Sequence, residues 1–287
     1  MAGEPSGHDR WKTIAGIVGA LTAVVALIQQ CTKTTDPSST KPTPAERQSA
    51  GGTPTAEAIA RRGDEYYAGL GDTPLNYAEA LQYYRNAANG GNAHAQDRLG
   101  EMYHAAQGVP ENLQEAVRWF SLSAEQKLPS AQGHLGVMYE NGKGGLAKEP
   151  AKAANLYSKA AEAGWAPSQS DLGRFYEFGL GGLPQDYKLA VKWYLKSAEQ
   201  GNNFGQLNVG RMYQSGGGSL IQDWSKAAIW YGKAADQGFD HAQYLLGLLY
   251  RDGNGVAKDR EKAKAFLQMA ATQGHREAAK ELAELQN

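Results

Sequence analysis

The chain has 287 residues, and its 29 lysines and arginines nearly balance its 30 aspartates and glutamates. This balance argues against nucleic acid as a partner, because a polyanion is bound by an excess of basic charge. The single cysteine excludes an intrachain disulfide and a metal cluster built on cysteines. Alanine and glycine are abundant while β-branched residues are sparse beyond the N-terminal segment, which favours packed helices over sheets.

The first predicted element is an apolar helix near the N-terminus. The run TIAGIVGALTAVVALI, residues 13–28, contains no charged side chain. As a helix it is about 24 Å long, and Trp11 and residues 29–31 extend it toward the roughly 30 Å core of a bilayer. We therefore predict a tail at residues 1–12 and an uncleaved transmembrane signal anchor at residues 13–31.

Two other interpretations of this segment stay open, a cleaved signal peptide and a buried helix of a soluble protein. The signal peptide is disfavoured because the apolar run continues into QQCTKTT, which contains no A-x-A-like cleavage site. Attachment of a lipid to Cys31 is also disfavoured, because that signal requires a small residue just before the cysteine and this chain has Gln30 there.

The basic residues around the predicted anchor decide its orientation only weakly. Arg10 and Lys12 precede the apolar run, and Lys33 and Lys41 follow it, so the positive-inside count is close to a tie. A short tail before a single apolar segment is the usual layout of a signal anchor. We therefore expect a single-pass membrane protein with its C-terminal body outside the cytoplasm, periplasmic if the source is bacterial; a cytoplasmic body is the alternative.

Small residues line one face of the predicted anchor. Ala15, Gly19 and Ala23 recur at every fourth position, and such a stripe lets two membrane helices approach closely. One interpretation is a homodimer through the Ala15/Gly19/Ala23 face. The other is that small residues are simply common in membrane spans.

Residues 32–56 are rich in threonine, serine and proline and contain almost no large apolar side chains. Such a segment buries too little surface to offset the entropy lost on ordering. We therefore predict a flexible linker here, with the folded body starting directly after it.

From residue 57 onward the chain repeats itself. A glycine, usually preceded by leucine, recurs at intervals of 36 or 37 residues, and a tyrosine follows it by three positions. The glycines are Gly63, Gly100, Gly136, Gly173, Gly210 and Gly247, and the tyrosines are Tyr66, Tyr103, Tyr139, Tyr176, Tyr213 and Tyr250. We interpret these positions as structural. A column of small residues, Ala95, Ala131, Ser168, Gly205 and Ala242, should together with the glycines let helices of neighbouring units pack closely.

A second pattern follows in every unit: ALQYYRNAA, AVRWFSLSA, AANLYSKAA, AVKWYLKSA, AAIWYGKAA and AKAFLQMAA. Its apolar positions recur at i, i+3, i+4, i+7 and i+8, which is one face of an amphipathic helix. Each unit therefore predicts a helix with L-G-x-x-Y, a glycine-rich loop and a second helix.

The glycine-rich loops resemble phosphate-binding loops only superficially. The stretch FGLGGLPQD, residues 178–186, precedes a predicted helix, but no copy of the loop has the G-K-S or G-K-T ending of a phosphate loop. Asp186 and its equivalents Asn76, Asn112, Asp223 and Asp259 are suited to cap the following helix. We interpret the glycines as turn residues.

These spaced motifs together resemble the Sel-one-like repeat family, a relative of the tetratricopeptide repeats; DWSKAAIWYGKAADQG, residues 223–238, shows the resemblance best. The resemblance implies an all-α, right-handed α-solenoid of about six helix-turn-helix repeats at residues 57–275. Residues 276–287 then form a polar capping helix. It also implies that the inner, concave surface holds a protein or peptide partner.

Two polar rows on the first helices are the candidate binding residues. They vary between units, and relative to the L-G glycine they lie one and four positions later. The first row consists of Glu101, Val137, Arg174, Arg211 and Leu248, and the second consists of His104, Glu140, Glu177, Gln214 and Arg251. We expect Arg174, Arg211 and Arg251 to lie outside the core columns and to form a basic strip for a carboxylate or acidic peptide. The alternative is ordinary solvation and pairing with neighbours such as Glu177.

An alternative partner is a polysaccharide or peptidoglycan strand of the cell envelope. Aromatic faces suit sugar rings, and Tyr77, Trp165, Tyr187 and Trp224 lie in turns or at helix starts, outside the core columns. The chain shows no H-E-x-x-H or G-x-S-x-G pattern among its histidines and serines. We therefore predict a non-enzymatic scaffold without a cofactor or a metal.

Overall fold

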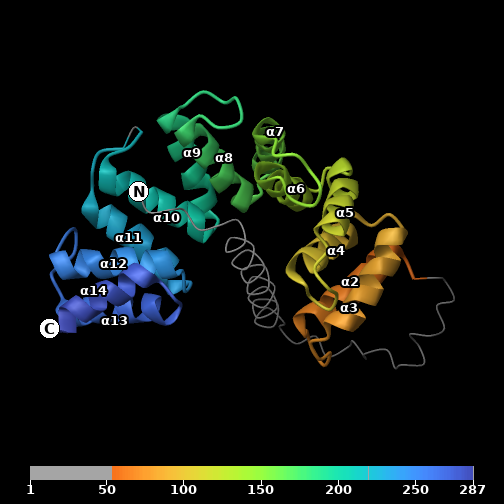
Figure 1. The fold of residues 1–287 in the computed structure, drawn as a ribbon, viewed down its shortest axis with the longest axis horizontal. Helices are drawn as coiled ribbons and strands as arrows, with labels where there is room; N and C mark the ends of the chain where they lie inside the picture. The colour runs from red at the N-terminus through yellow and green to blue at the C-terminus, as the bar shows by residue number, and fades with distance from the viewer. Residues whose placement is uncertain (1–53, 219, 287) are drawn as a thin grey trace, which may run out of the picture. The chain divides into compact units, whose positions relative to one another are not determined.

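The computed structural model describes residues 54–218 and 220–286, and these residues form helices without a β-strand (Figure 1). The predicted all-α class is therefore confirmed for this part of the chain. The predicted anchor at residues 13–31 and residues 32–53 of the predicted linker lie outside it. Within the described ranges, no helix is both long enough and apolar enough to cross a bilayer.

The helices follow one another along the described chain with short connections. They are α2 (Ala56–Ala68), α3 (Tyr77–Asn89), α4 (Ala93–Ala105), α5 (Leu113–Glu125), α6 (Pro129–Asn141), α7 (Pro150–Glu162), α8 (Ala166–Phe178), α9 (Tyr187–Glu199), α10 (Asn203–Ser215), α11 (Trp224–Asp236), α12 (Asp240–Asp252), α13 (Arg260–Thr272) and α14 (Arg276–Gln286). The even-numbered helices α2 to α12 carry L-G-x-x-Y or its variants and are called first helices below. The odd-numbered ones are called second helices.

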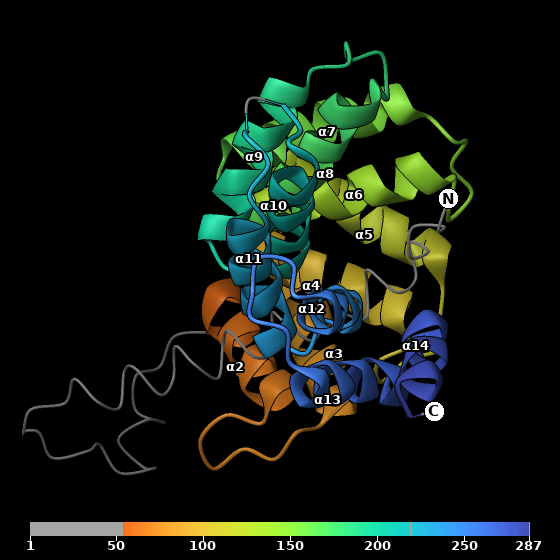
Figure 2. The same cartoon turned by 90° about the vertical axis from the view of Figure 1, so that its left-hand side faces the viewer.

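The described chain divides into two compact units on either side of the Lys148–Glu149 boundary. The first unit contains α2 to α6 and the second contains α7 to α14. Within each unit every helix packs against the next one in sequence. Figures 1 and 2 both show this for α12, α13 and α14, which lie side by side. Each unit is thus a series of helices in which every member packs on the next.

Most second helices begin at a polar cap, as the sequence predicts. The side chain of Asp186 accepts hydrogen bonds from the backbone N–H groups of Lys188 and Leu189, both at 2.9 Å. The equivalent caps are Asn76, Asn112, Asp223 and Asp259. Helix α7 differs, because Glu149 makes no such bond and Pro150 starts the helix instead. Proline fits there because the first helical N–H has no partner within the helix.

Gly63, Gly100, Gly173 and Gly210 each contact an aromatic ring of the same repeat, whereas Gly247 contacts Leu267. A Cβ on Gly173 would lie 2.7 Å from Cδ1 of Tyr194, and one on Gly100 would lie 2.4 Å from Cε1 of Phe120. The ring therefore lies directly on the backbone of the first helix, closer than any other residue type allows. Tyr84, Phe120, Tyr194 and Tyr231 are fully buried in this way.

Consecutive repeats meet through the predicted column of small residues. A Cβ on Gly205 of α10 would lie 2.6 Å from the backbone N of Ala198 in α9. The members Ala95, Ala131, Ser168 and Ala242 are all buried. This confirms that the column lets neighbouring repeats approach closely.

A column of buried glutamines, which the sequence analysis overlooks, also joins the repeats. Nε2 of Gln206 donates to the carbonyl of Ala198 in the preceding second helix at 3.4 Å. Nε2 of Gln237 then donates to Oε1 of Gln206 at 2.8 Å. Gln96, Gln169 and Gln243 repeat both bonds. The column thus satisfies carbonyl groups at the end of each preceding helix.

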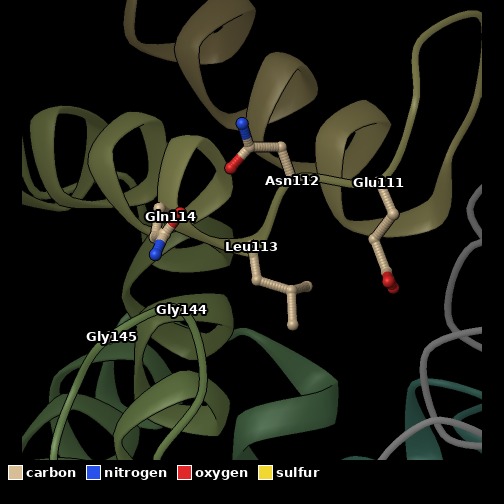
Figure 3. Close-up of a pocket in the computed structure, with 6 residues that line it drawn as sticks. All are labelled: Glu111, Asn112, Leu113, Gln114, Gly144 and Gly145. Carbon is tan, nitrogen blue, oxygen red and sulfur yellow. The ribbon is translucent and has the colours of Figure 1, made fainter.

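The glycine-rich loops pack against the preceding repeat. Gly181 has a φ of +62°, and a Cβ there would lie 2.5 Å from the carbonyl oxygen of Pro150 at the start of α7. Gly144 meets Leu113 at the start of α5 in the same way (Figure 3). The loop glycines are therefore turn and contact residues, as the sequence predicts.

A buried ion pair connects α4 and α6 in the first unit. Nδ1 of His134 lies 2.8 Å from Oδ1 of Asp97, and the hydroxyl of Ser130 donates to Oδ2 of Asp97 at 2.5 Å. Burial alone would raise the pKa of Asp97, but the charge of His134 and its hydrogen bond lower it. Burial alone would lower the pKa of His134, but Asp97 outweighs this and raises it. Folding thus favours the charged form of the pair over the neutral form.

Replacing Asp97 with asparagine should destabilise the fold by about 3–5 kcal/mol near pH 6, because the buried imidazolium of His134 loses its counter-ion. The pKa of His134 is raised on folding, so its contribution is fully present below the unfolded pKa of about 6.5 and is lost as the pH rises through the folded pKa. Urea unfolding of the wild type and Asp97→Asn at pH 6 and pH 9 should therefore give a smaller difference at pH 9. Equal differences would contradict a charged pair.

Candidate functional site

The predicted polar rows lie on the first helices, and in the first unit they are largely internal. Glu101 is buried, and its Oε2 accepts a hydrogen bond from Nη1 of Arg98 at 2.8 Å. Its Oε1 lies 3.6 Å from Nε2 of His134. His104 is also buried, and Glu140 is half-buried near the end of α6. Glu101 and His104 are therefore not open to a partner in this arrangement.

In the second unit, Glu177 is the centre of the polar row. It is 3% exposed and lies on α8. It accepts hydrogen bonds from the hydroxyl of Tyr194 at 2.7 Å and from Nη1 and Nη2 of Arg211 at 2.7 and 2.5 Å. Arg211 on α10 thus forms the bidentate hydrogen bond that is favoured between a guanidinium and a carboxylate.

The charges in this group reinforce one another. Burial and the negative charge of Glu177 raise the pKa of Tyr194 well above its usual value, so the hydroxyl keeps its proton and remains a donor. Burial alone would lower the pKa of Arg211, but its hydrogen bonds to Glu177 and their opposite charges raise it. Arg211 also donates to Oδ1 of Asn208 at 3.2 Å. Its side chain is 41% exposed, so one edge of the group faces solvent.

The expectation that Arg174 lies outside the core is wrong. Arg174 is only 6% exposed, its Nη2 lies 3.4 Å from Oδ1 of Asp171, and its guanidinium lies 5.1 Å from the ring centre of Phe175. One turn of helix separates it from Asp171, which allows the pair to form inside the packed helix face.

Arg251 lies at the other end of the predicted strip and is also paired. Its Nε and Nη2 donate to Asp252 at 2.7 and 2.9 Å, and its Nη1 donates to Glu281 of α14. Together with Arg174 and Arg211, it shows that each of the three arginines has a carboxylate partner. The structure therefore agrees with the alternative of ordinary pairing rather than with an open basic strip.

Hydroxyl groups from the second helices position the polar row. The hydroxyl of Tyr231 donates to Oε1 of Gln214 at 2.6 Å, as that of Tyr194 does to Glu177. In the first unit Tyr84 donates to Oδ1 of Asp64 at 2.7 Å. From the sequence these tyrosines are predicted as packing residues on the apolar face, and the partners of their hydroxyls are not predicted. The available signal is a tyrosine rather than phenylalanine at a buried position, since a buried hydroxyl requires a partner.

Sequence reasoning also misses Asp97, Arg98, His134, Asp171 and Asn208. All five lie two or three positions before an L-G glycine. Asp97 stands out once the repeats are aligned, because its column contains alanine, glycine, serine, leucine and tyrosine in the other repeats. The column two positions before the glycine is polar in every repeat except at Leu245, so its members do not stand out.

Asp97, Glu101 and His134 place one potential metal-ligand atom each within 4.8 Å of one another. The guanidinium of Arg98 already contacts Glu101, and the imidazole of His134 contacts Asp97. Two positive groups therefore balance the two carboxylates, and a divalent cation would face the charge of Arg98 at close range. We interpret this cluster as an ion-pair network.

The same cluster contains the residue types of a hydrolytic triad without its geometry. The hydroxyl of Ser130 donates to Asp97 rather than to His134. The pKa of His134 is raised, as its pairing with Asp97 outweighs burial, so the ring tends to hold a proton already and cannot accept another. A serine nucleophile requires the reverse arrangement, with a neutral imidazole accepting its proton.

A hollow of about 470 Å³ lies between the start of α5 and the loop that follows α6 (Figure 3). It is lined by Glu111, Asn112, Leu113, Gln114, Gly144 and Gly145. One carboxylate and two amides do not form a nucleophile with a base, and Asn112 is occupied in capping α5. We therefore assign this hollow to the packing between loop and helix.

The four aromatic residues proposed for a sugar are mostly packed. Trp165 and Trp224 are half-buried at the starts of α8 and α11. Tyr77 lies edge-on to Tyr67, with ring centres 5.3 Å apart. Tyr187 is 46% exposed and accepts a hydrogen bond from Gln185. Among these four, Tyr187 alone has an exposed ring.

Comparisons with known proteins agree with the helix pairs described above. Six consecutive segments match the model of the Sel1 repeat, at residues 56–92, 93–128, 129–165, 166–202, 204–239 and 240–275. The comparison with curated proteins gives no significant match.

Solved structures share this fold. A Sel1 repeat protein from Oxalobacter formigenes is 29% identical with a TM-score of 0.68, and the match covers 80% of this chain and 88% of that one. A protective antigen present in uropathogenic Escherichia coli strains is 36% identical with a TM-score of 0.62. That match covers 80% of this chain but only 48% of the antigen, so the chain spans about half the antigen's length.

An immunity protein from Pseudomonas aeruginosa is 19% identical with a TM-score of 0.51, over 77% of this chain and 83% of that one, and shares the fold alone. The six matched segments contain the L-G glycines, the capped second helices and the small-residue column that build the helix pairs. The chain belongs to the Sel1 repeat family.

Proposed function

We propose that this chain is a membrane-tethered scaffold that binds a protein or peptide partner along the polar face of its first helices. Sel1 repeat proteins are generally protein-interaction scaffolds. A non-enzymatic role fits two clusters among the described residues. Neither the Asp97–Ser130–His134 cluster nor the hollow beside Gly144 pairs a nucleophile with a neutral base.

The Tyr194–Glu177–Arg211 group carries this proposal. Buried Glu177 holds a half-exposed guanidinium in one orientation. Three of the five N–H groups of Arg211 are used in bonds to Glu177 and Asn208. The remaining N–H groups of Arg211 can donate to a carboxylate or a peptide carbonyl of a partner. Because the side chain is already ordered, little side-chain entropy is lost on binding.

The polysaccharide alternative has less support. A sugar-binding groove requires several exposed aromatic faces along one path, and Tyr187 alone among the four candidates presents one. We therefore favour a protein or peptide partner.

The tether rests on residues 13–31 and the linker at residues 32–56, with the repeats outside the cytoplasm. Protease added to intact cells, or to spheroplasts if the source is bacterial, should digest the repeats. Protection that lasts until the membrane is permeabilised would reverse the orientation, and recovery of the full chain in the soluble fraction would remove the tether.

A photo-reactive benzoylphenylalanine can locate the binding face. Leu248 lies in the first polar row on α12 and is half-buried, whereas Ile229 lies on α11 and is 59% exposed. We expect a crosslinked partner from position 248 and none from position 229. Crosslinking at position 229 alone would place the partner on the second helices.

The partner found in this way can then test Arg211. Replacing Arg211 with alanine should weaken binding by about 1–3 kcal/mol, or roughly five- to hundredfold, because a charge-assisted hydrogen bond is lost. Arg118→Ala is the matched control, since this arginine is exposed and pairs with Glu115 on a second helix. Equal affinities for the wild type and Arg211→Ala would exclude this group from the interface.

A further inference from the structure

Two stacked histidines fasten the C-terminal helix α14 to the last helix pair. Nδ1 of His275 accepts the backbone N–H of Ala278 at 3.2 Å, so His275 caps α14. Its Nε2 lies 3.1 Å from Nδ1 of His241 in α12. The two rings are 5.4 Å apart and nearly parallel, and the ring of His275 also stacks on Tyr244 at 4.5 Å.

These contacts determine where the protons lie. Nδ1 of His275 accepts a hydrogen bond, so it carries no proton, and the proton of this neutral ring is on Nε2. That proton is donated to Nδ1 of His241, whose own proton is then on Nε2. A further proton must go to Nδ1 of one ring. On His275 it removes the cap, and on His241 it places two N–H groups face to face.

Charged groups surround the pair from three helices. Burial and the neighbouring His275 lower the pKa of His241, while Asp240 and Glu277 oppose this effect. Oε2 of Glu277 lies 3.6 Å from Nδ1 of His275, so it can compensate a proton there only after the cap is lost. The charged groups that face the two histidines and Tyr244 are Arg211 of α10, Asp240 and Arg251 of α12, and Glu277 and Glu281 of α14.

Apart from the histidine contacts, helix α14 packs chiefly against α13. Ala278 and Leu282 pack against Leu267 and Ala270 of α13. Glu281 pairs with Arg251, and Arg260 donates to the carbonyl of Leu285. A terminal helix that packs through one narrow apolar face unfolds locally at a lower free energy than the helices inside the stack. The loss of a cap and an inter-ring hydrogen bond is therefore large relative to the remaining contacts.

We propose that mild acid releases α14 from the last helix pair through the His241–His275 contact, and thereby uncovers the apolar surface of Leu267 and Ala270. This step uses contacts other than those of the proposed partner face, although the charge of Arg211 also helps to lower the pKa of His241.

The direction of the effect follows from linkage. The pKa of His241 is lowered on folding, so the folded state favours the neutral ring. Above the unfolded pKa of about 6.5 this ring does not reduce the stability of the folded state, and the stability decreases as the pH falls below that value. The Asp97–His134 pair of the first unit has the opposite sign. Unfolding of α14 by acid is therefore separable from any effect of that pair.

Hydrogen exchange of the purified full chain at pH 7.5 and 5.5 tests the proposal. The intrinsic exchange rate at each pH is divided by the measured rate, which gives protection factors. We expect protection of the amides at residues 278–285 to fall about threefold or more at pH 5.5, while amides of α8 keep theirs. Unchanged protection at residues 278–285, or an equal fall in α8, would overturn the proposal.

The double variant His241→Gln/His275→Asn is the matched control. Glutamine keeps an acceptor at position 241, asparagine keeps a strong cap at position 275, and neither titrates in this range. Protection of α14 should then be independent of pH, and a fall as large as in the wild type would overturn the proposal. If the variant fails to dock α14 at pH 7.5, the wild type decides: an NMR titration midpoint of His241 at or above 6.5 would overturn it.

Discussion

The contact between a second-helix ring and the bare backbone of a first-helix glycine is the constraint on which the other features depend. Gly173 and Tyr194 show it clearly, because a single added carbon would lie 2.7 Å from the ring. This contact sets the distance between the two helices of a repeat. Tyr194 is fully buried as a result, and its hydroxyl emerges beside Glu177 on the polar face. One residue thus serves both packing and the candidate site.

This arrangement explains why the polar face consists of ordered pairs. A buried carboxylate is stable only with partners, and Glu177 has the hydroxyl of Tyr194 and the guanidinium of Arg211. Asp97 has Ser130 and His134 in the same way. Repeats that share one backbone plan can therefore present different chemical groups, since each needs only a compatible partner on an adjacent helix.

The periodic features of the sequence predict the backbone well. The spacing of the L-G glycines locates the helix pairs, and Asp186 and its equivalents cap the second helices as expected. Lys127 stands where the other repeats have a glycine at the end of the second helix, namely Gly91, Gly164, Gly201, Gly238 and Gly274. Like these glycines it adopts a positive φ, of 65°. These features are local, so a residue and its near neighbours along the chain determine them.

The depth and pairing of side chains could not be predicted in this way. Arg174 and Arg211 occupy the same column, yet Arg174 is buried against Asp171 and Arg211 reaches across to Glu177 of the preceding first helix. The two histidine contacts likewise differ, because His134 faces a carboxylate while His241 faces another histidine. Except for Arg174, whose partner Asp171 is three residues away, these outcomes depend on partners 30 or more residues away. A column position specifies neither partner nor depth.

The most direct measurement is a double-mutant cycle between Gly210 and Tyr231, whose ring would lie 2.6 Å from an added Cβ. Gly210→Ala should destabilise the wild type by about 1–3 kcal/mol in urea unfolding, because the ring has no room to move. In a Tyr231→Ala background the same change should cost nothing or stabilise by up to about 1 kcal/mol, since alanine favours a helix over glycine. An equal cost in both backgrounds would contradict the claim that the ring seats on the glycine.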